Sequence, residues 1–291
     1  MEIGQQFKKD SDLKRKARLH QSTYRANVLK VGYDEFGNML KEEDAKKGLN
    51  FYNDFSILQA VESRHGAKYD KQLYANMLRS EHITFNLFIP LLSDLEYAKN
   101  ALNGFVSNSI HTITDIQIAY APDPAKDYLD DRTAFDACVM YRLADGGTGI
   151  LGIEVKYSEQ EYPLKKRSKE DIDIHNPASN YWMVSIKSNL FAKADEKKLI
   201  HDDFRQMWRN QLLGESIKQV DKIDYFTSII LYPGSNTHFA RVVPAFSSLV
   251  KKQGRFKGIT YEEFFEALSK HANSTRYENW IAYLRERYLF E

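Results

Sequence analysis

The chain has 291 residues, of which 43% are hydrophobic and 28% are charged, and its formal net charge is +1. These values are typical of a globular protein with a substantial core, and they exclude both a disordered chain and a uniformly basic nucleic-acid binder. The single cysteine, Cys138, excludes an intramolecular disulfide and fits a reducing cytosol. The polar N-terminus and the lack of a long apolar run predict a cytoplasmic protein with no membrane partner.

Residues 1–68 are expected to form a basic, helical extension. Within it, residues 8–28 predict a helix in which lysine and arginine outnumber the acidic residues. Such a charge run is most often a solvated helix face, but it would also suit a contact with nucleic-acid phosphates or a partner subunit. Residues 32–53 are rich in turn-forming residues and predict a loop with short ordered pieces.

Helical spacing of apolar residues follows over residues 69–102, and Pro90 is expected to kink or re-cap this helix. Residues 110–120, with Ile113, Ile116 and Ile118, predict the first strand of a sheet. Residues 121–131 are rich in proline and aspartate and predict a loop.

Residues 133–159 predict two β-strands joined by a tight turn at Asp145-Gly146-Gly147. Because residues two apart share a face of a strand, Asp136 lies on one face with Cys138, and Glu154 shares a face with Lys156. The second strand is apolar enough to be the buried centre of a sheet. A carboxylate and an ammonium are costly there unless they are paired, bound to a metal ion, or both.

Asp136 in the first strand and Glu154-Val155-Lys156 in the second resemble the PD-(D/E)XK nuclease superfamily, which has the restriction-endonuclease-like fold. The run EVKYSE at residues 154–159 is similar to a bacterial restriction-endonuclease branch of it. The resemblance implies that Asp136 and Glu154 bind Mg²⁺ or Mn²⁺. It implies that Lys156 orients or deprotonates the attacking water, or stabilises developing charge. A buried ion pair without catalysis would explain the same three residues.

The resemblance also gives a role to the run SEHITFNLF at residues 80–88. The superfamily opens with a helix that often presents a glutamate to the metal site, and Glu81 would be that glutamate. The implied metal ligands are therefore Asp136, Glu154 and Glu81. Without the resemblance, Glu81 is an ordinary carboxylate on a helix.

The basic residues Lys165, Lys166 and Arg167 follow directly on the strand that carries Glu154. A loop in that position is where a phosphate backbone would be gripped. The polar stretch 160–200 around this loop predicts an insertion, which either forms a substrate flap or covers the sheet.

Residues 201–220 predict a strongly amphipathic helix. The resemblance implies that this helix packs beside the active site and that a glutamine on it contacts the site. Gln206 and Gln211 are both candidates, since the sequence does not fix the register. Arg205 and Arg209 lie one turn apart and are predicted phosphate contacts.

Residues 225–232 predict a buried strand, which completes the αβββαβ order of the superfamily core. The fold class is therefore α/β with a mixed central sheet over residues 69–246, and residues 247–291 form a C-terminal helical cap. A further strand is predicted near residues 239–243, and helices are predicted near 261–269 and 278–288. The aromatic residues of the cap fit internal packing or a homodimer surface.

Together these features predict a Mg²⁺-dependent endonuclease that hydrolyses phosphodiester bonds, with DNA as the expected substrate and bacterial restriction or phage defence as the setting. The alternative is a catalytically silent protein of the same fold that binds nucleic acid or another protein. The intact Asp136, Glu154 and Lys156 set favours the enzyme, because a silent scaffold need not keep three costly polar groups on one buried face. The sequence has no glycine-rich phosphate loop and no G-x-S-x-G elbow that would support a different α/β enzyme.

Overall fold

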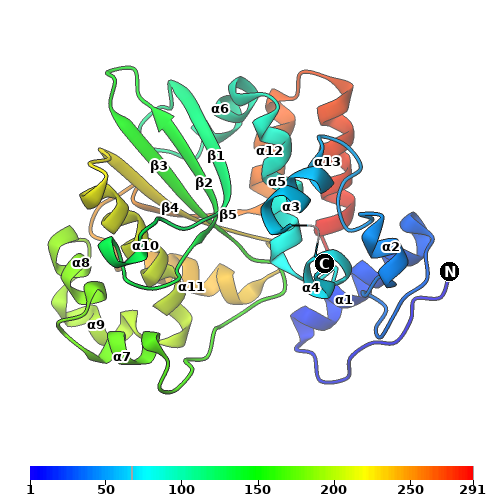
Figure 1. The fold of residues 1–291 in the computed structure, drawn as a ribbon, viewed down its shortest axis with the longest axis horizontal. Coiled ribbons are helices and arrows are strands. Elements are labelled where there is room, and N and C mark those ends of the chain that lie inside the picture. Colours follow the sequence, from blue (N-terminus) through cyan, green and yellow to red (C-terminus); the bar gives the residue numbers. More distant parts are fainter. Residues whose placement is uncertain (67, 291) are drawn as a thin grey trace.

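The computed structural model describes residues 1–66 and 68–290. Its centre is a five-stranded sheet in the order β1-β2-β3-β4-β5 (Figure 1). The β1–β2 and β2–β3 pairs are antiparallel, whereas the β3–β4 and β4–β5 pairs are parallel. The fold is therefore α/β with a mixed sheet. The strands are β1 (Thr112–Tyr120), β2 (Phe135–Arg142), β3 (Thr148–Val155), β4 (Tyr225–Tyr232) and β5 (Phe256–Thr260).

The hairpin between β2 and β3 follows from its turn residues and its small residues. Gly146 has φ +88°, in the left-handed region that glycine reaches without a steric penalty. Gly152 faces Cys138 in the register, and a Cβ atom at Gly152 would lie 2.5 Å from the Phe135 ring. The close packing of that ring against the middle of β3 therefore requires glycine at position 152.

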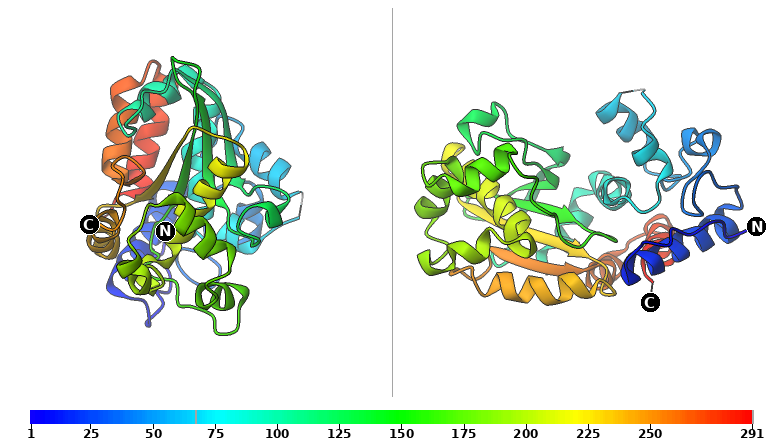
Figure 2. Two further views of the ribbon diagram at one scale, coloured as in Figure 1. Left: turned by 90° about the vertical axis from the view of Figure 1, so that its left-hand side faces the viewer. Right: turned by 90° about the horizontal axis from the view of Figure 1, so that it is seen from below.

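Helices cover both faces of the sheet (Figures 1 and 2). Strand residues at positions such as Ala137, Ile153 and Val155 pack in one apolar cluster with α5, α6, α12 and α13. Residues on the other face, such as Cys138 and Ile150, pack with α8, α10 and α11. The helices of these layers are α5 (Ser80–Leu92), α6 (Leu95–Asn103), α8 (Asn180–Ser188), α10 (Asp202–Val220), α11 (Thr237–Ser247), α12 (Tyr261–His271) and α13 (Thr275–Tyr288).

The N-terminal helices pack on the first of these clusters, beside the C-terminal helix α13. Gln21 Nε2 donates hydrogen bonds to the Tyr157 hydroxyl at 2.8 Å and to the Arg287 carbonyl at 2.6 Å. The two ends of the chain therefore meet next to the end of β3. The remaining N-terminal elements are α1 (Asp12–Tyr24), a π-helical turn (Arg25–Leu29), α2 (Glu42–Lys46), α3 (Ile57–His65) and α4 (Lys71–Ala75).

The stretch 160–200 folds into α7 (Lys169–His175), α8 and α9 (Glu196–Leu199), with a 3-10 turn at Lys193–Asp195. Trp182 of α8 lies against Trp208 of α10, with ring centres 4.8 Å apart. The stretch therefore covers α10 rather than the sheet itself. A second 3-10 turn, Ala125–Asp127, lies between β1 and β2.

Two expectations about single elements are wrong. Residues 239–243 lie in α11, not in a strand, because Asn236 caps a helix there by accepting from the Phe239 N–H, and the last strand is β5. The helical pattern of residues 69–102 is divided among α4, α5 and α6, and Pro90 lies inside the last turn of α5 without ending it. The predicted helices near 261–269 and 278–288 are confirmed as α12 and α13. In the described part of the chain, no helix is long and apolar enough to cross a membrane.

Candidate active site

Asp136 and Glu154 lie on neighbouring strands, on the face of the sheet that α10 covers. Ala137 pairs with Ile153 in the β2–β3 register, so Asp136 lies next to Glu154 at the following position. Asp136 Oδ2 accepts a hydrogen bond from the Val155 backbone N–H at 2.8 Å. The hairpin thus brings the two carboxylates together and fixes one of them by a main-chain bond.

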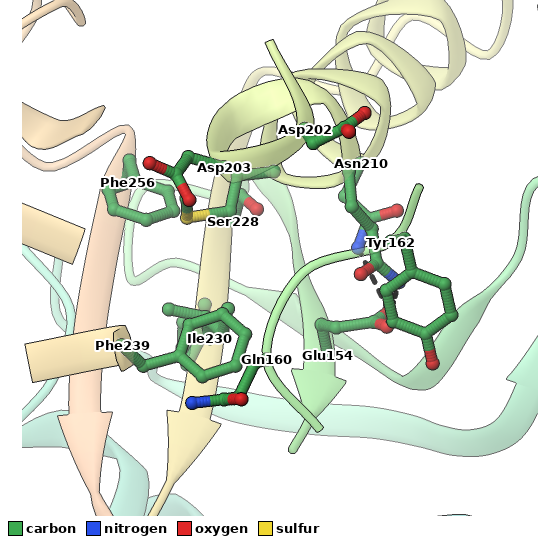
Figure 3. A pocket seen from close by; sticks show the side chains of 13 residues that line it. Glu154, Gln160, Tyr162, Asp202, Asp203, Asn210, Ser228, Ile230, Phe239 and Phe256 are labelled. Carbon is green, nitrogen blue, oxygen red and sulfur yellow. Dashed lines mark hydrogen bonds between the residues drawn. The ribbon is translucent and has the colours of Figure 1, made fainter. Parts of the chain in front are cut away.

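Three side-chain donors surround the Glu154 carboxylate. Oε1 accepts from Lys156 Nζ at 2.6 Å and from Gln206 Nε2 at 2.6 Å, and Oε2 accepts from Asn210 Nδ2 at 2.9 Å. Figure 3 shows Asn210 reaching from α10 towards Glu154, with Tyr162 beside them. Because both of its oxygens are held, Glu154 has a defined orientation despite its position at the end of a strand.

Lys156 follows directly on β3 and is almost fully buried, with 2% of its side chain exposed. Its backbone N–H donates to the Leu231 carbonyl at 2.8 Å, and its own carbonyl accepts from the Tyr261 hydroxyl at 2.7 Å. The ammonium lies 4.7 Å from the centre of the Tyr162 ring. Two main-chain bonds therefore hold Lys156 at the site, and an aromatic ring covers its charge.

This cluster combines two acidic side chains, Asp136 and Glu154, with one basic side chain, Lys156. Burial and the neighbouring Glu154 carboxylate raise the pKa of Asp136 well above its ordinary value. Burial by itself would lower the pKa of Lys156, but Glu154, Tyr162 and Asp136 outweigh it and raise that pKa. The lysine is an ammonium at neutral pH, and it faces two carboxylates. A second cation at the site would relieve the repulsion between them.

The two carboxylates fit a hard divalent ion such as Mg²⁺. Mg²⁺ is usually bound by one or two carboxylates, keeps several waters, and takes further oxygens from substrate phosphates. Among residues 1–66 and 68–290, no group of three or more His, Cys, Asp or Glu side chains is arranged to hold a metal ion. If the two carboxylates bind such an ion, its remaining ligands would be waters and substrate oxygens.

Glu81, in the first turn of α5, has His65 and Arg79 as basic neighbours. Its carboxylate is 3.8 Å from His65 Nε2 and 3.7 Å from Arg79 Nη2, and 37% of the side chain is exposed. Its predicted role as a third metal ligand remains a prediction. A different carboxylate, Glu159, joins the start of the same helix to the site: it accepts from the Ser80 N–H at 3.4 Å and from the Tyr157 N–H at 2.7 Å.

Of the two candidate glutamines, the structure brings Gln206 to the site, whereas Gln211 is buried beside Glu215. Sequence analysis missed Asn210, although it lies one turn after Gln206 and so shares its helix face. The i, i+4 spacing of two amides was the signal that would have found it. Tyr162 was missed as well, since an aromatic residue in a polar loop has no pattern that assigns it to a site.

The predicted phosphate contacts differ in exposure. Arg205 is buried and donates to the Glu170 carboxylate at 2.7 Å, and Arg209 forms ion pairs with Asp131 at 3.1 Å and with Glu170 at 3.0 Å. Both arginines are therefore engaged in internal bonds that fasten α10 to the loops around it, and a role in phosphate binding would require those bonds to open. The predicted contacts that are exposed are Lys165, Lys166 and Arg167.

Comparison with known proteins agrees with the geometry. Neither the curated proteins nor the solved structures gave a match to this chain. A family model does match, and it extends over residues 8–290, nearly the whole chain. The sheet, the hairpin and the Asp136, Glu154 and Lys156 cluster all lie within that match. The chain belongs to the PD-(D/E)XK nuclease superfamily.

Proposed function

We propose that the protein is a Mg²⁺- or Mn²⁺-dependent endonuclease that hydrolyses phosphodiester bonds in DNA. The observation that carries this proposal is the cluster of Asp136, Glu154 and Lys156 at the end of the β2–β3 hairpin, with Gln206 and Asn210 fixing Glu154. A role in bacterial restriction or phage defence follows only from the resemblance of the run at residues 154–159 to such enzymes.

Asp136 and Glu154 would hold the ion, since their oxygens are the hard donors that it prefers. When bound, the ion lowers the pKa of a water and neutralises charge on the phosphate. Lys156 would act beside it as an ammonium that orients the attacking water or stabilises negative charge as it develops. Gln206 and Asn210 keep Glu154 in place, so that no reorientation is needed as the reaction proceeds.

The exposed basic residues Lys165, Lys166 and Arg167 would contact the phosphate backbone. They begin ten residues or so after β3 ends, so the strand that carries Glu154 leads directly into them. This placement supports a path for DNA from the basic loop to the two carboxylates.

The test is incubation of the purified protein with linear duplex DNA, circular duplex DNA, single-stranded DNA and RNA, each with Mg²⁺, Mn²⁺ or a chelator. We expect DNA cleavage that requires the metal and is abolished in Asp136→Asn and Glu154→Gln. Cleavage that persists in the chelator would refute metal dependence, and cleavage of RNA alone would refute the DNA assignment. A protein that binds DNA but cleaves no substrate with any metal would be the catalytically silent alternative.

Glu81→Gln is the informative companion variant. If Glu81 reaches the metal during catalysis, this change lowers cleavage to a similar extent as Asp136→Asn. If Glu81 remains with His65 and Arg79, as in the structure, cleavage is retained.

A further inference from the structure

We infer that the N-terminal extension forms a binding pocket for one unpaired nucleotide of the DNA substrate, next to the catalytic cluster. This inference deepens the proposed function and rests on the chain acting on DNA. It concerns a cavity of about 410 Å³ between α1, the loop after it, α4 and the segment that follows β3. Its lining combines two phenylalanines, three side-chain amides and several charged residues.

The cavity adjoins the active site. Ser158 and Glu159, in its wall, follow Lys156 by two and three residues, and Glu159 accepts a hydrogen bond from the Tyr157 N–H at 2.7 Å. Arg79, also in the wall, precedes Ser80, whose N–H donates to the same Glu159 carboxylate at 3.4 Å. A strand with its scissile phosphate at Asp136 and Glu154 would therefore have a neighbouring nucleotide at this cavity.

The volume and the chemistry of the lining suit a nucleotide. Ligand pockets of small molecules usually have volumes of about 300–1,000 Å³ and combine apolar surface with a few placed polar groups. Phe7 and Phe36 supply aromatic surface, with ring centres 5.6 Å apart. Aromatic side chains of this kind stack on bases of any sequence.

A chain of amides offers hydrogen bonds to the edge of a base. Asn38 Nδ2 donates to Asn76 Oδ1 at 2.9 Å, and Asn76 Nδ2 donates to Gln72 Oε1 at 2.9 Å. Gln72 is the last amide of this series and is exposed, so its side-chain nitrogen is available to a ligand. A base that stacks on these rings and hydrogen-bonds its edge to these amides is not paired in a duplex.

Cations at the rim fit the phosphate of the same nucleotide. Lys14 is exposed, whereas Arg79 lies 3.7 Å from Glu81 and Lys71 forms an ion pair with Asp34, and the side chains of both pairs are partly exposed. Exposed ion pairs contribute little energy, so Lys71 can exchange its carboxylate for a phosphate oxygen.

Internal contacts hold the wall of the cavity in place. Arg18 is buried, pairs with Asp10 at 2.5 Å, and lies 5.2 Å from the Phe36 ring centre. Gly37 follows Phe36, and a Cβ atom there would lie 2.3 Å from the Ile3 carbonyl oxygen. The close approach of the N-terminal segment to this loop therefore fixes both Phe36 and Asn38.

The test measures binding by the full chain, with Ca²⁺ in place of Mg²⁺, of a short fluorescein-labelled single-stranded DNA and of the matching blunt duplex. We expect the single strand to bind more tightly. Lys14→Glu should weaken its binding by roughly tenfold, whereas Lys16→Glu, on the same helix and outside the cavity, should have a much smaller effect. Phe7→Leu, at a partly exposed ring, should also weaken binding by roughly tenfold.

Equal effects of Lys14→Glu and Lys16→Glu, or equal binding of single strand and duplex, would overturn the pocket. Its failure is distinguishable from failure of the nuclease proposal. Metal-dependent cleavage with unchanged binding in the pocket variants refutes the pocket alone. Binding that depends on Lys14 and Phe7 in a protein that cleaves nothing refutes the nuclease alone. A parent chain that binds no DNA refutes both.

Discussion

Two of the buried charged clusters in this protein compensate their charges in different ways. Arg287 of α13 is fully buried and is surrounded by neutral partners. Its guanidinium donates to the Tyr283 hydroxyl at 2.7 Å and to Asn50, and it lies 5.3 Å from the Tyr24 ring centre and 5.4 Å from that of Tyr288. These hydrogen bonds and ring faces compensate one charge without a carboxylate.

The cluster at the end of β3 has instead two carboxylates and one ammonium. The Glu154 oxygens are well satisfied, but burial and Glu154 raise the pKa of Asp136 well above its ordinary value. An arrangement of this kind is unfavourable for the protein by itself and becomes favourable with a bound cation. The comparison therefore contrasts a buried charge that neutral groups compensate with a cluster that we propose binds a cation.

The largest effect that tests this difference is expected for Lys156→Ala. If Lys156 acts in the reaction, single-turnover cleavage should fall by about a hundredfold or more, while DNA binding is retained. If it is only half of a buried ion pair, the free energy of unfolding should fall by about 3–5 kcal/mol. Thermal melts and cleavage rates on the same variant distinguish the two. Lys169→Ala, at a lysine in exposed ion pairs with Asp130 and Asp173, is the control and should change neither.

For Arg287→Met we expect the reverse, a loss of stability without a loss of cleavage. This change removes the guanidinium that donates to the Tyr283 hydroxyl and to the side-chain oxygen Oδ1 of Asn50, so the free energy of unfolding should fall by about 2–3 kcal/mol. Cleavage per folded molecule should be unchanged. Urea denaturation measures the first quantity. Arg285→Met, on the same helix but exposed, should stay within about 0.5 kcal/mol of the parent. A large loss of cleavage in folded Arg287→Met would remove the separation between the clusters.

A smaller effect is expected from the amides that hold Glu154. Gln206→Leu removes a 2.6 Å hydrogen bond to Oε1, and such supporting bonds are typically worth at least about tenfold in activity or metal affinity. We therefore expect about a tenfold loss of cleavage with little loss of stability. Gln211→Leu is the matched control, because Gln211 lies on the same helix but contacts Glu215. Equal losses of cleavage in both variants would show that the effect comes from a disturbed α10 and not from the lost contact with Glu154.

The sequence was sufficient for much of the fold, because most of its core elements have strong local patterns. The strand over residues 225–232 has the predicted bounds, α10 begins one residue later than predicted, and the β2–β3 hairpin lies within the predicted residues 133–159. Residues 239–243 were misjudged because their valines and phenylalanine suit a strand or a helix, and the helix depends on a cap from Asn236. Residues 160–200 are polar, and their helices are stabilised by packing on Trp208, which no local pattern reveals.

In the site, too, relations set by local sequence were predictable, and relations set by packing between distant elements were not. Asp136 and Glu154 are neighbours through hairpin register, which is a local property, and so their proximity was predictable. The position of Glu81 depends on how α5 packs on the sheet, and the partners of Arg205 and Arg209 depend on where Glu170 and Asp131 fall after folding. The catalytic roles of all these residues remain predictions until variants are measured.

The last prediction uses pH, and its effect is the smallest. Without divalent ions, the folded-state pKa of Asp136 is raised above the ordinary value of 3.8. The folded state then binds the proton more tightly than the unfolded state, so this group's contribution to stability is present below pH 3.8 and is lost as pH rises through the folded pKa. Asparagine does not ionise, so Asp136→Asn removes this loss of stability. Its melting temperature in chelator should match the parent at low pH and exceed it at neutral pH.

Asp224→Asn is the control of opposite sign. Asp224 also accepts a backbone N–H of β3, that of Thr148 at 2.8 Å, but it is exposed, and this bond lowers its pKa. Its contribution is present above the unfolded pKa and is lost as pH falls through the folded pKa, so this variant should melt earlier than the parent at neutral pH. Mg²⁺ should raise the melting temperature of the parent and of Asp224→Asn, but not that of Asp136→Asn. If Asp136→Asn melts earlier than the parent at neutral pH, the bond from Asp136 to Val155 outweighs the repulsion, and Asp136 belongs with Arg287 as a stabilising residue.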